Sequence, residues 1–324
     1  MKTTDKILIA TGLLFILCSL ANSQVKARRV LDYDGDGKAD VTVLRSSENN
    51  WYTNKSNGNV LSVTNFGVVH TDTPAPGDYD GDGKGDVGIW RYSNGAFYSI
   101  DSSTGALRVV QWGTNGDEVI ERDFDGDGKT DHAVIRRTGT AASPGAMVWY
   151  IRRSSDGGAT IVQFGLNTDV AAPGDFDGDG KWDIGVMRQG TTAGSQAVFY
   201  ALLSQTSTVK VTSWGLYGDQ FVPGDYDNDG KTDLAVVRRN STPSSYLAWY
   251  ILRSSDGGFA ASAFGTTETD TPIQNDYDGD GKCDLAVYRE TNGVHYILKS
   301  TDGNILGYNW GYSTDIPIAG YDVH

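Results

Sequence analysis

Short apolar and aromatic runs alternate with polar turns along most of the chain. Residues 234–238 and 249–252 are rich in β-branched and aromatic side chains, and a polar connection separates them. The Ser-Ser-Asp-Gly-Gly cluster at 254–258 is typical of a turn, and a further run follows at 260–263. With residues 220–222 ahead of them, these runs predict four short strands and no helix.

The same skeleton recurs six times, and each copy contains one nine-residue motif: Asp, aromatic, Asp, Gly, Asp, Gly, Lys, any residue, Asp. The copies occupy residues 32–40, 78–86, 123–131, 175–183, 225–233 and 276–284. The only change in the central Gly-Asp-Gly is Asn228, which replaces the first Gly of the fifth copy. Successive copies start 46, 45, 52, 50 and 51 residues apart, a period that indicates one supersecondary unit per copy.

The motif concentrates four carboxylates, at positions one, three, five and nine, and these repel one another unless a cation lies between them. Ca²⁺ takes about 6–8 oxygen ligands in flexible loops, whereas Mg²⁺, the alternative ion, demands a stricter octahedron. The Gly at position six permits a sharp turn, and the Lys carbonyl at position seven is the expected fifth ligand by analogy with other calcium loops. We therefore predict about six Ca²⁺ sites. Their ligands are Asp32, Asp34, Asp36, Lys38 and Asp40; Asp78, Asp80, Asp82, Lys84 and Asp86; Asp123, Asp125, Asp127, Lys129 and Asp131; Asp175, Asp177, Asp179, Lys181 and Asp183; Asp225, Asp227, Asp229, Lys231 and Asp233; Asp276, Asp278, Asp280, Lys282 and Asp284.

An EF-hand is excluded because its loop needs a Glu at position twelve. This chain has only Val or Ile at that position, which predicts that a strand follows each loop. These residues are Val43, Ile89, Val134, Val186, Val236 and Val287.

Two aromatic positions recur in every unit. The first is an aromatic or His residue followed by Tyr: Trp51-Tyr52, Phe97-Tyr98, Trp149-Tyr150, Phe199-Tyr200, Trp249-Tyr250 and His295-Tyr296. The second is an aromatic-Gly pair: Phe66-Gly67, Trp112-Gly113, Phe164-Gly165, Trp214-Gly215, Phe264-Gly265 and Trp310-Gly311. Recurrence in every unit favours packing between neighbouring sheets over sugar stacking.

An Arg ends the second predicted strand of each unit, and an Asp follows each aromatic-Gly pair. The Arg residues are Arg45, Arg91, Arg136, Arg188, Arg238 and Arg289, and the Asp residues are Asp72, Asp117, Asp169, Asp219, Asp270 and Asp315. We expect these two sets to form structural ion pairs within or between the units.

Four-stranded units of this length, repeated radially, predict an all-β fold, a β-propeller of six four-stranded blades over residues 24–324. The acidic loops and the aromatic-Gly pairs resemble the FG-GAP or VCBS repeat family, to which integrin α-chain propellers belong. The resemblance covers about residues 26–324 and implies calcium loops between the first and second strands of the blades. It implies no single activity, because the fold hosts adhesion modules, lectins and some lyases.

The C-terminal residues 315–322 look like the start of a seventh unit that then stops. We expect them to supply an inner strand that closes the ring on the first blade, although residues 26–31 compete for the same place. Integrin propellers have seven blades, so a seven-bladed ring is the alternative.

Residues 7–20 form an apolar run after a basic start, with the length of a signal-peptide core rather than of a membrane span. We expect a signal peptide at 1–23, a mature chain from Gln24, and a secreted, extracellular or cell-surface protein without a membrane span. A retained anchor is the alternative, and a lipoprotein at Cys18 is disfavoured because no small residue precedes it. Loss of Cys18 would leave Cys283 unpaired.

The formal net charge is −14, and the six loops hold 24 of the 41 acidic residues. The acidity is thus mainly ligand charge. We expect no nucleic-acid partner, because the sequence contains no basic patch that could neutralise phosphates.

The connections between the second and third strands are longer in units three, four and five than in the others. Their tips lie at residues 139–145, 190–196 and 240–246 and are rich in Thr, Ser, Ala and Gly. Because loops on a rigid scaffold commonly carry binding, this sector is the expected partner site, with tolerated insertions as the alternative.

The leading functional prediction is a secreted calcium-binding propeller that acts as a non-catalytic adhesion or binding module for a glycan or an extracellular protein. A lectin or a carbohydrate-active enzyme, such as a polysaccharide lyase, is the alternative. The His residues are scattered over different units, and few acids lie outside the repeats. The His residues are His70, His132, His295 and His324. The acids outside the repeats that could act in catalysis are Glu118, Glu121 and Glu268.

Overall fold

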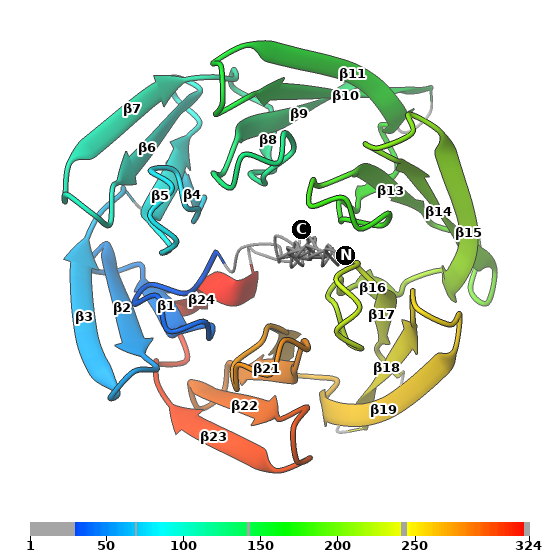
Figure 1. Cartoon of the computed structure of the whole chain (residues 1–324). Coiled ribbons are helices and arrows are strands. Elements are labelled where there is room, and N and C mark those ends of the chain that lie inside the picture. The colour runs from blue at the N-terminus through cyan, green and yellow to red at the C-terminus, as the bar shows by residue number, and fades with distance from the viewer. Residues whose placement is uncertain (1–29, 69, 141–142, 241–244, 321–324) are drawn as a thin grey trace, which may run out of the picture.

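The computed structural model describes residues 30–68, 70–140, 143–240 and 245–320. The predicted signal peptide at 1–23 and the proposed mature start at Gln24 lie outside these residues. Within them, 24 strands form six antiparallel four-stranded sheets. The sheets are arranged radially around a central axis, as Figure 1 shows. The prediction of a six-bladed β-propeller is therefore confirmed, and the seven-bladed alternative does not apply.

The strands of each blade are given from the axis outward. Blade 1 contains β24 (Ile316–Pro317), β1 (Val41–Arg45), β2 (Asn50–Lys55) and β3 (Val60–Asn65). Blade 2 contains β4 (Asp72–Pro74), β5 (Val87–Arg91), β6 (Ala96–Ile100) and β7 (Leu107–Gln111). Blade 3 contains β8 (Glu118–Val119), β9 (His132–Gly139), β10 (Pro144–Arg152) and β11 (Ala159–Leu166).

The remaining three blades follow the same order. Blade 4 contains β12 (Val170–Ala171), β13 (Ile184–Arg188), β14 (Gln196–Leu202) and β15 (Val209–Leu216). Blade 5 contains β16 (Gln220–Phe221), β17 (Leu234–Arg238), β18 (Tyr246–Leu252) and β19 (Phe259–Thr266). Blade 6 contains β20 (Asp270–Pro272), β21 (Leu285–Arg289), β22 (Val294–Leu298) and β23 (Ile305–Asn309). One short 3₁₀ turn, η1 (Ile318–Gly320), follows β24.

The apolar pattern of each strand matches its distance from the axis. The second strands, such as β17 and β21, are buried at four successive residues, because neighbouring blades cover both of their faces. The third strands alternate buried and half-buried residues, and the outer strands, such as β7 and β23, alternate exposed and half-buried residues.

The aromatic positions pack between blades, as the sequence predicts, and the tryptophan alternates between two places. In blades 1, 3 and 5 the indole lies on the third strand, is at most 1% exposed, and donates to the carbonyl of the aromatic-Gly pair; these residues are Trp51, Trp149 and Trp249. In blades 2, 4 and 6 it lies near the end of the outer strand or directly after it, and donates to a Tyr carbonyl of the next blade; these residues are Trp112, Trp214 and Trp310. The contact between blades 2 and 3 holds two indoles, since Trp90 packs in the same cluster as Trp112.

The two ends of the described chain meet in blade 1. β24 pairs with β1, with Ile316 opposite Leu44 and Pro317 opposite Val43. Ile318 is fully buried in the cluster that joins blades 1 and 6. The predicted closure by residues 315–322 is therefore confirmed for the described part, and β24 takes the inner place for which residues 26–31 were the alternative.

All six predicted Arg–Asp pairs form, and each lies within one blade. Arg91 binds Asp72 through two hydrogen bonds of 2.7 and 2.8 Å, and its guanidinium also lies over the Tyr98 ring at 4.6 Å. The other pairs are Arg45–Asp315, Arg136–Asp117, Arg188–Asp169, Arg238–Asp219 and Arg289–Asp270. Each Asp also accepts the backbone N–H of the residue after the aromatic-Gly pair. The pair therefore joins the second strand to the connection between blades.

Candidate metal sites

Each acidic loop directly precedes the second strand of its blade, and the six loops lie around the axis of the ring (Figure 1). In blades 2 to 6 the loop connects the first strand to the second, whereas in blade 1 the first strand is β24 from the other end of the described chain. The turns between the third and fourth strands lie on the same side of the ring, because successive strands alternate in direction. We call this side the loop face. The connections between second and third strands, and from one blade to the next, form the opposite face.

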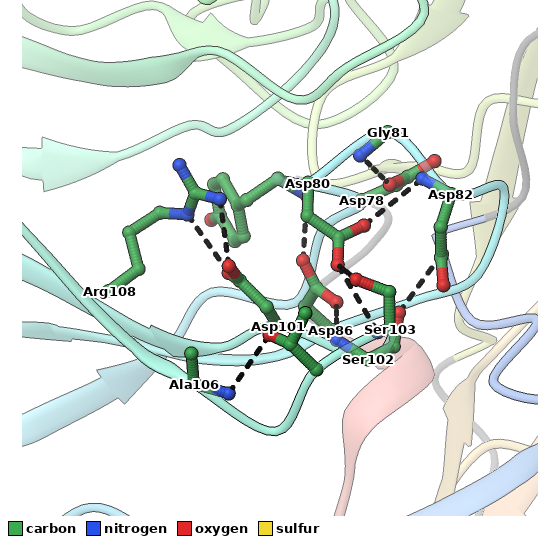
Figure 2. Close-up of polar contacts among 12 residues, drawn as sticks. Asp78, Asp80, Gly81, Asp82, Asp86, Asp101, Ser102, Ser103, Ala106 and Arg108 are labelled. Atoms are coloured by element: carbon green, nitrogen blue, oxygen red, sulfur yellow. Dashed lines mark hydrogen bonds and ion pairs between the residues drawn. The ribbon is translucent and has the colours of Figure 1, made fainter.

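The first Asp of each motif organises the backbone of its loop. In blade 2, Asp78 accepts the N–H group of Gly81 at 2.7 Å (Figure 2). It also accepts the N–H group of Gly83 at 3.0 Å. Both bonds recur in every other loop, at 2.5–2.6 Å to position four and 2.8–3.0 Å to position six. The two glycines have φ values of +83° and +88°, which L side chains rarely adopt. The Asp and the glycines together therefore fix the tight turn.

The last Asp of each motif joins the loop to the turn between the third and fourth strands. Asp86 accepts the N–H of Tyr79 at 2.8 Å and that of Ser102 at 2.6 Å. The equivalent bond to the first residue of the turn is 2.6–2.7 Å in all six blades. Each site is therefore built from two segments that are 16 to 23 residues apart in sequence.

The serine-rich turns complete the sites, a role that the sequence analysis did not assign to them. In blade 2, Ser102 Oγ donates to Asp82 at 3.0 Å and Ser103 Oγ donates to Asp80 at 2.6 Å, as Figure 2 shows. Residues equivalent to Ser103 that donate to the third-position Asp are Asn57, Ser155, Gln205, Ser255 and Thr301. The Ser-Ser repeat was a signal for this contact, but only the fold shows which loop it meets.

Burial raises the pKa of the ninth-position carboxyls, and the backbone N–H groups that they accept lower it only in part. The pKa is raised to about 7 for Asp131 and to about 6 for Asp40, Asp86, Asp183, Asp233 and Asp284. Burial likewise raises the pKa of Asp123, at position one, to about 6. Carboxyls with raised pKa values at the bottom of an acidic loop are those that a bound cation would return to the charged form.

The residues present fit a hard cation. Carboxylate oxygens of three Asp residues lie within 4.8 Å of one another in each group, for example those of Asp175, Asp177 and Asp183. The donor set is all oxygen, as Ca²⁺ and Mg²⁺ require. The Oδ1 atoms of Asp177 and Asp227 are buried and have no hydrogen-bond partner among the described residues. A cation in these loops would satisfy both atoms, which otherwise carry an uncompensated desolvation cost.

Hydrogen bonds join the six loops into a closed ring. The N–H at position eight of each motif donates to the carbonyl of position one in the preceding blade, at 2.7–2.9 Å. The donors are Ala39, Gly85, Thr130, Trp182, Thr232 and Cys283. The bond from Ala39 to Asp276 closes the ring between blades 1 and 6. The loops therefore do not stand alone: each one contacts its two neighbours.

The Lys side chain at position seven packs across the same boundary. A Cβ built on Gly35, Gly81, Gly126, Gly178 or Gly279 would lie 2.7–3.1 Å from the Lys stem of the adjacent loop. In the fifth loop Asn228 replaces this Gly with a φ of 66°, and its amide donates to the Asp280 carbonyl at 3.4 Å. Asn tolerates this left-handed conformation better than other side chains with a Cβ.

Comparison with known proteins agrees with this architecture. Residues 32–89, which span the first two acidic loops, match the family described as FG-GAP-like repeat. The same motif occurs in all six blades of the ring, so the family match and the architecture together support a propeller built from FG-GAP-like repeats. The chain matches no curated protein at a significant level.

Several solved structures have a similar fold. TolB from Acinetobacter baumannii has a TM-score of 0.54 at 17% identity, over 86% of this chain and 63% of TolB. A lectin from Agrocybe aegerita that recognises non-reducing terminal N-acetylglucosamine has a TM-score of 0.54 at 15% identity, over 89% of this chain and 96% of the lectin. The Photorhabdus luminescens Tc holotoxin pore has a TM-score of 0.50 at 15% identity, over 87% of this chain and 14% of that chain. The chain thus spans less than two thirds of TolB and a small part of the toxin. At these identities the similarity shows the fold alone.

In the described part of the chain, no helix has the length and apolarity needed to cross a membrane.

Proposed function

We propose that the chain is a secreted, calcium-stabilised propeller that acts as a non-catalytic binding module. The observation that carries the calcium assignment is the set of six all-oxygen loops, two of which contain a buried carboxylate oxygen without a partner. A flexible oxygen-rich loop without an enforced octahedron favours Ca²⁺ over Mg²⁺. Bound Ca²⁺ would strengthen the ring, because each loop is hydrogen-bonded to the next.

Calorimetry on metal-stripped protein tests the calcium assignment. Addition of Ca²⁺ should raise the melting temperature, since at 100-fold saturation one site contributes about 2.7 kcal/mol. A titration with Mg²⁺ at the same concentrations distinguishes the two ions, and D80N in a single loop should reduce the measured stoichiometry by one. A melting curve that Ca²⁺ leaves unchanged would refute the assignment.

The opposite face of blades 3, 4 and 5 is the proposed partner site. The outer strands of these blades, β11, β15 and β19, have eight residues, against five or six in the other blades. Each third strand there carries a β-bulge near its start. The longer connections are therefore raised on extensions of the sheets in one sector of the ring.

These extensions are fixed to the scaffold. Arg137 donates to the carbonyls of Asn167 and Asp169 at 3.0 and 2.6 Å. Gln189 and Arg239 occupy the same place in blades 4 and 5 and donate to equivalent carbonyls. A preorganised surface binds its partner with a smaller entropic cost than a mobile one.

The chemistry of this sector suits a glycan. Tyr217 and Tyr246 are 51% and 66% exposed, and the connections beside them carry mainly Thr, Ser and Gly. Aromatic faces stack on sugar rings, and hydroxyls exchange hydrogen bonds with sugar hydroxyls. The lectin of similar fold recognises a terminal N-acetylglucosamine. A neutral glycan is therefore the proposed partner, and an extracellular protein is the other outcome of the test.

A glycan and cell-surface protein array tests the partner site. The wild type should bind a glycan, and Y217A with Y246A should weaken that binding at least about tenfold through loss of stacking. Y312A is the matched control, because Tyr312 is equally exposed, at 63%, on the same face but outside the sector. Equal loss of binding in the control and the double variant would contradict the location.

The histidines argue against acid–base catalysis by these side chains. Burial lowers the pKa of His132 and of His295 to about 3, so both are neutral at physiological pH. His132 stacks on Tyr79 at 4.9 Å, and His295 contacts Tyr288 at 4.8 Å. Of the acids outside the repeats, Glu118 pairs with Arg137 and Glu121 is 2% exposed. These observations favour a binding module over the alternative of a polysaccharide lyase.

A further inference from the structure

A cavity of about 190 Å³ lies between blades 4 and 5, which are adjacent in Figure 1. Its floor is apolar and includes Phe199, Ala201 and Leu234, which are 4%, 6% and 9% exposed. Its rim is polar and includes Lys210 and Arg253. The cavity is therefore amphipathic, with an apolar end inside and two cations at the mouth.

The cavity follows from small residues in one row of blade 4. Ala201 on β14 lies opposite Gly185 on β13 and Lys210 on β15, so all three belong to the same face of the sheet. Blades 3, 5 and 6 place an Ile where blade 4 has Ala201; these residues are Ile151, Ile251 and Ile297. The missing branched side chain leaves space that the adjacent blade does not fill.

Blade 2 has a similar row, but a ring of blade 3 packs against it. There His132 of blade 3 packs on Phe97, with ring centroids 5.0 Å apart. The cation of that row, Arg108, is held by Asp101 through two bonds of 2.9 Å. Lys210, by contrast, makes no ion pair among the described residues. The contact between blades 4 and 5 thus combines open volume with an exposed Lys that has no ion-pair partner among the described residues.

We propose that this cavity binds a small aromatic carboxylate. A cavity of about 150 Å³ lined by apolar side chains is known to hold benzene, so this one has room for a benzene ring and one more group. The ring would contact Phe199 and Ala201, and the carboxylate would lie at the mouth beside Lys210. Arg253 is already paired with the exposed Asp256 at 2.9 Å, so Lys210 supplies the unpaired charge.

Three probes test the chemical class on the intact chain by saturation-transfer NMR and calorimetry. Phenylacetate carries both ring and charge, 2-phenylethanol carries the ring alone, and acetate carries the charge alone. Phenylacetate should bind at millimolar concentration or below and more tightly than either of the other two. Failure of phenylacetate to bind, or equal binding of 2-phenylethanol, would overturn the proposal.

Two variants test the location. A201I introduces the residue that three other blades carry and should reduce phenylacetate affinity at least about tenfold, because it fills the cavity. K210Q should reduce affinity by about threefold, the effect of one partly exposed charge, and should leave the affinity for 2-phenylethanol unchanged.

A matched control and a fold check make these results decisive. R153Q removes a cation of blade 3 that does not line the cavity, so it should leave the affinity for phenylacetate unchanged. Arg153 pairs with Asp156 in the same way as Arg253 pairs with Asp256. The melting temperature of each variant confirms folding, and F199W, which introduces the Trp of blades 1, 3 and 5, fills the same cavity if A201I does not fold. Unchanged affinity in a folded cavity-filling variant would place the ligand elsewhere and overturn the proposal.

Discussion

At the residue scale, individual residues of the motif have distinct structural roles. The first Asp fixes the loop backbone, and the ninth Asp attaches the loop to the serine-rich turn. The glycines at positions four and six adopt positive φ, and the fourth also lies against the Lys stem of the next blade. The motif therefore stabilises the loop and its contacts with the turn and the next blade, in addition to supplying candidate metal ligands.

The glycine at position four can be tested against a glycine that has only the conformational constraint. G105A places a methyl group in open space at a φ of +69° and should cost about 1 kcal/mol of unfolding free energy. G81A has a similar φ of +83°, but its Cβ would lie 2.7 Å from the Lys129 side chain, so its cost should be greater. Urea unfolding measures both; equal values would show that the Lys contact contributes nothing.

The raised pKa values predict that the stability of metal-stripped protein falls as the pH rises, the opposite of the trend expected with bound Ca²⁺. The carboxyls of Asp86 and Asp131 have folded pKa values of about 6 and 7, above the value of 3.8 for an unperturbed Asp. Their contribution to stability is present below about pH 4 and is lost as the pH rises through 6 to 7. The melting temperature without metal should therefore fall over this interval. With saturating Ca²⁺ the carboxylates are held charged, so it should rise instead; parallel curves with and without Ca²⁺ would contradict the assignment.

At the element scale, an Arg–Asp pair gives each blade a link that strand pairing alone does not provide. The pair joins the end of the second strand to the connection that enters the blade, and the guanidinium covers a Tyr of the third strand. Three successive segments of chain are thus joined at one point of the opposite face. The same unit occurs in all six blades, including blade 1, where the partners come from the two ends of the described chain.

R91A should destabilise the protein by about 3 kcal/mol, because it leaves the carboxylate of Asp72, which is 3% exposed, without its partner. R153A removes a pair of similar geometry in which both side chains are 30% or more exposed, and it should change stability little. Urea unfolding of the two variants gives the comparison. Similar losses would mean that burial of the Asp is not the source of the effect.

At the scale of the whole molecule, closure depends on few residues. β24 contributes two residues to blade 1, and η1 places Ile318 in the cluster between blades 1 and 6. The hydrogen bond from Ala39 to Asp276 and the contact of Lys38 with Gly279 close the loop ring at the same boundary. The boundary between blades 1 and 6, which we call the seam, is therefore stabilised both by β24 and η1 and by the contacts between the loops.

I318A should cost about 2–5 kcal/mol, since it leaves a cavity where a fully buried side chain closes the ring. I305A, at a residue of β23 that is 62% exposed, is the control and should have a much smaller effect. Hydrogen exchange should show the largest loss of protection in blades 1 and 6. Uniform loss in all blades would show that the seam is no weaker than the other contacts.

The sequence by itself determined the six repeats, the position of the acidic loops and the Arg and Asp residues that form the ion pairs, because each of these recurs with a regular period and a local chemical reason. The structure decided between six and seven blades and showed that each pair lies within one blade. Strand periodicity and turn residues are short-range properties, so they can be read from neighbouring residues. The inner strand near residue 316 could be predicted for the same reason, because residues 315–322 form an incomplete repeat.

The tertiary structure alone decided which distant groups meet. The contacts of Ser102 and Ser103 with the loop, the hydrogen bonds from each loop to the next, and the cavity beside Ala201 all depend on how blades and turns face one another. No local pattern specifies these contacts, because they join residues from 16 positions apart, as for Ser102 and Asp86, to opposite ends of the described chain, as for Ala39 and Asp276.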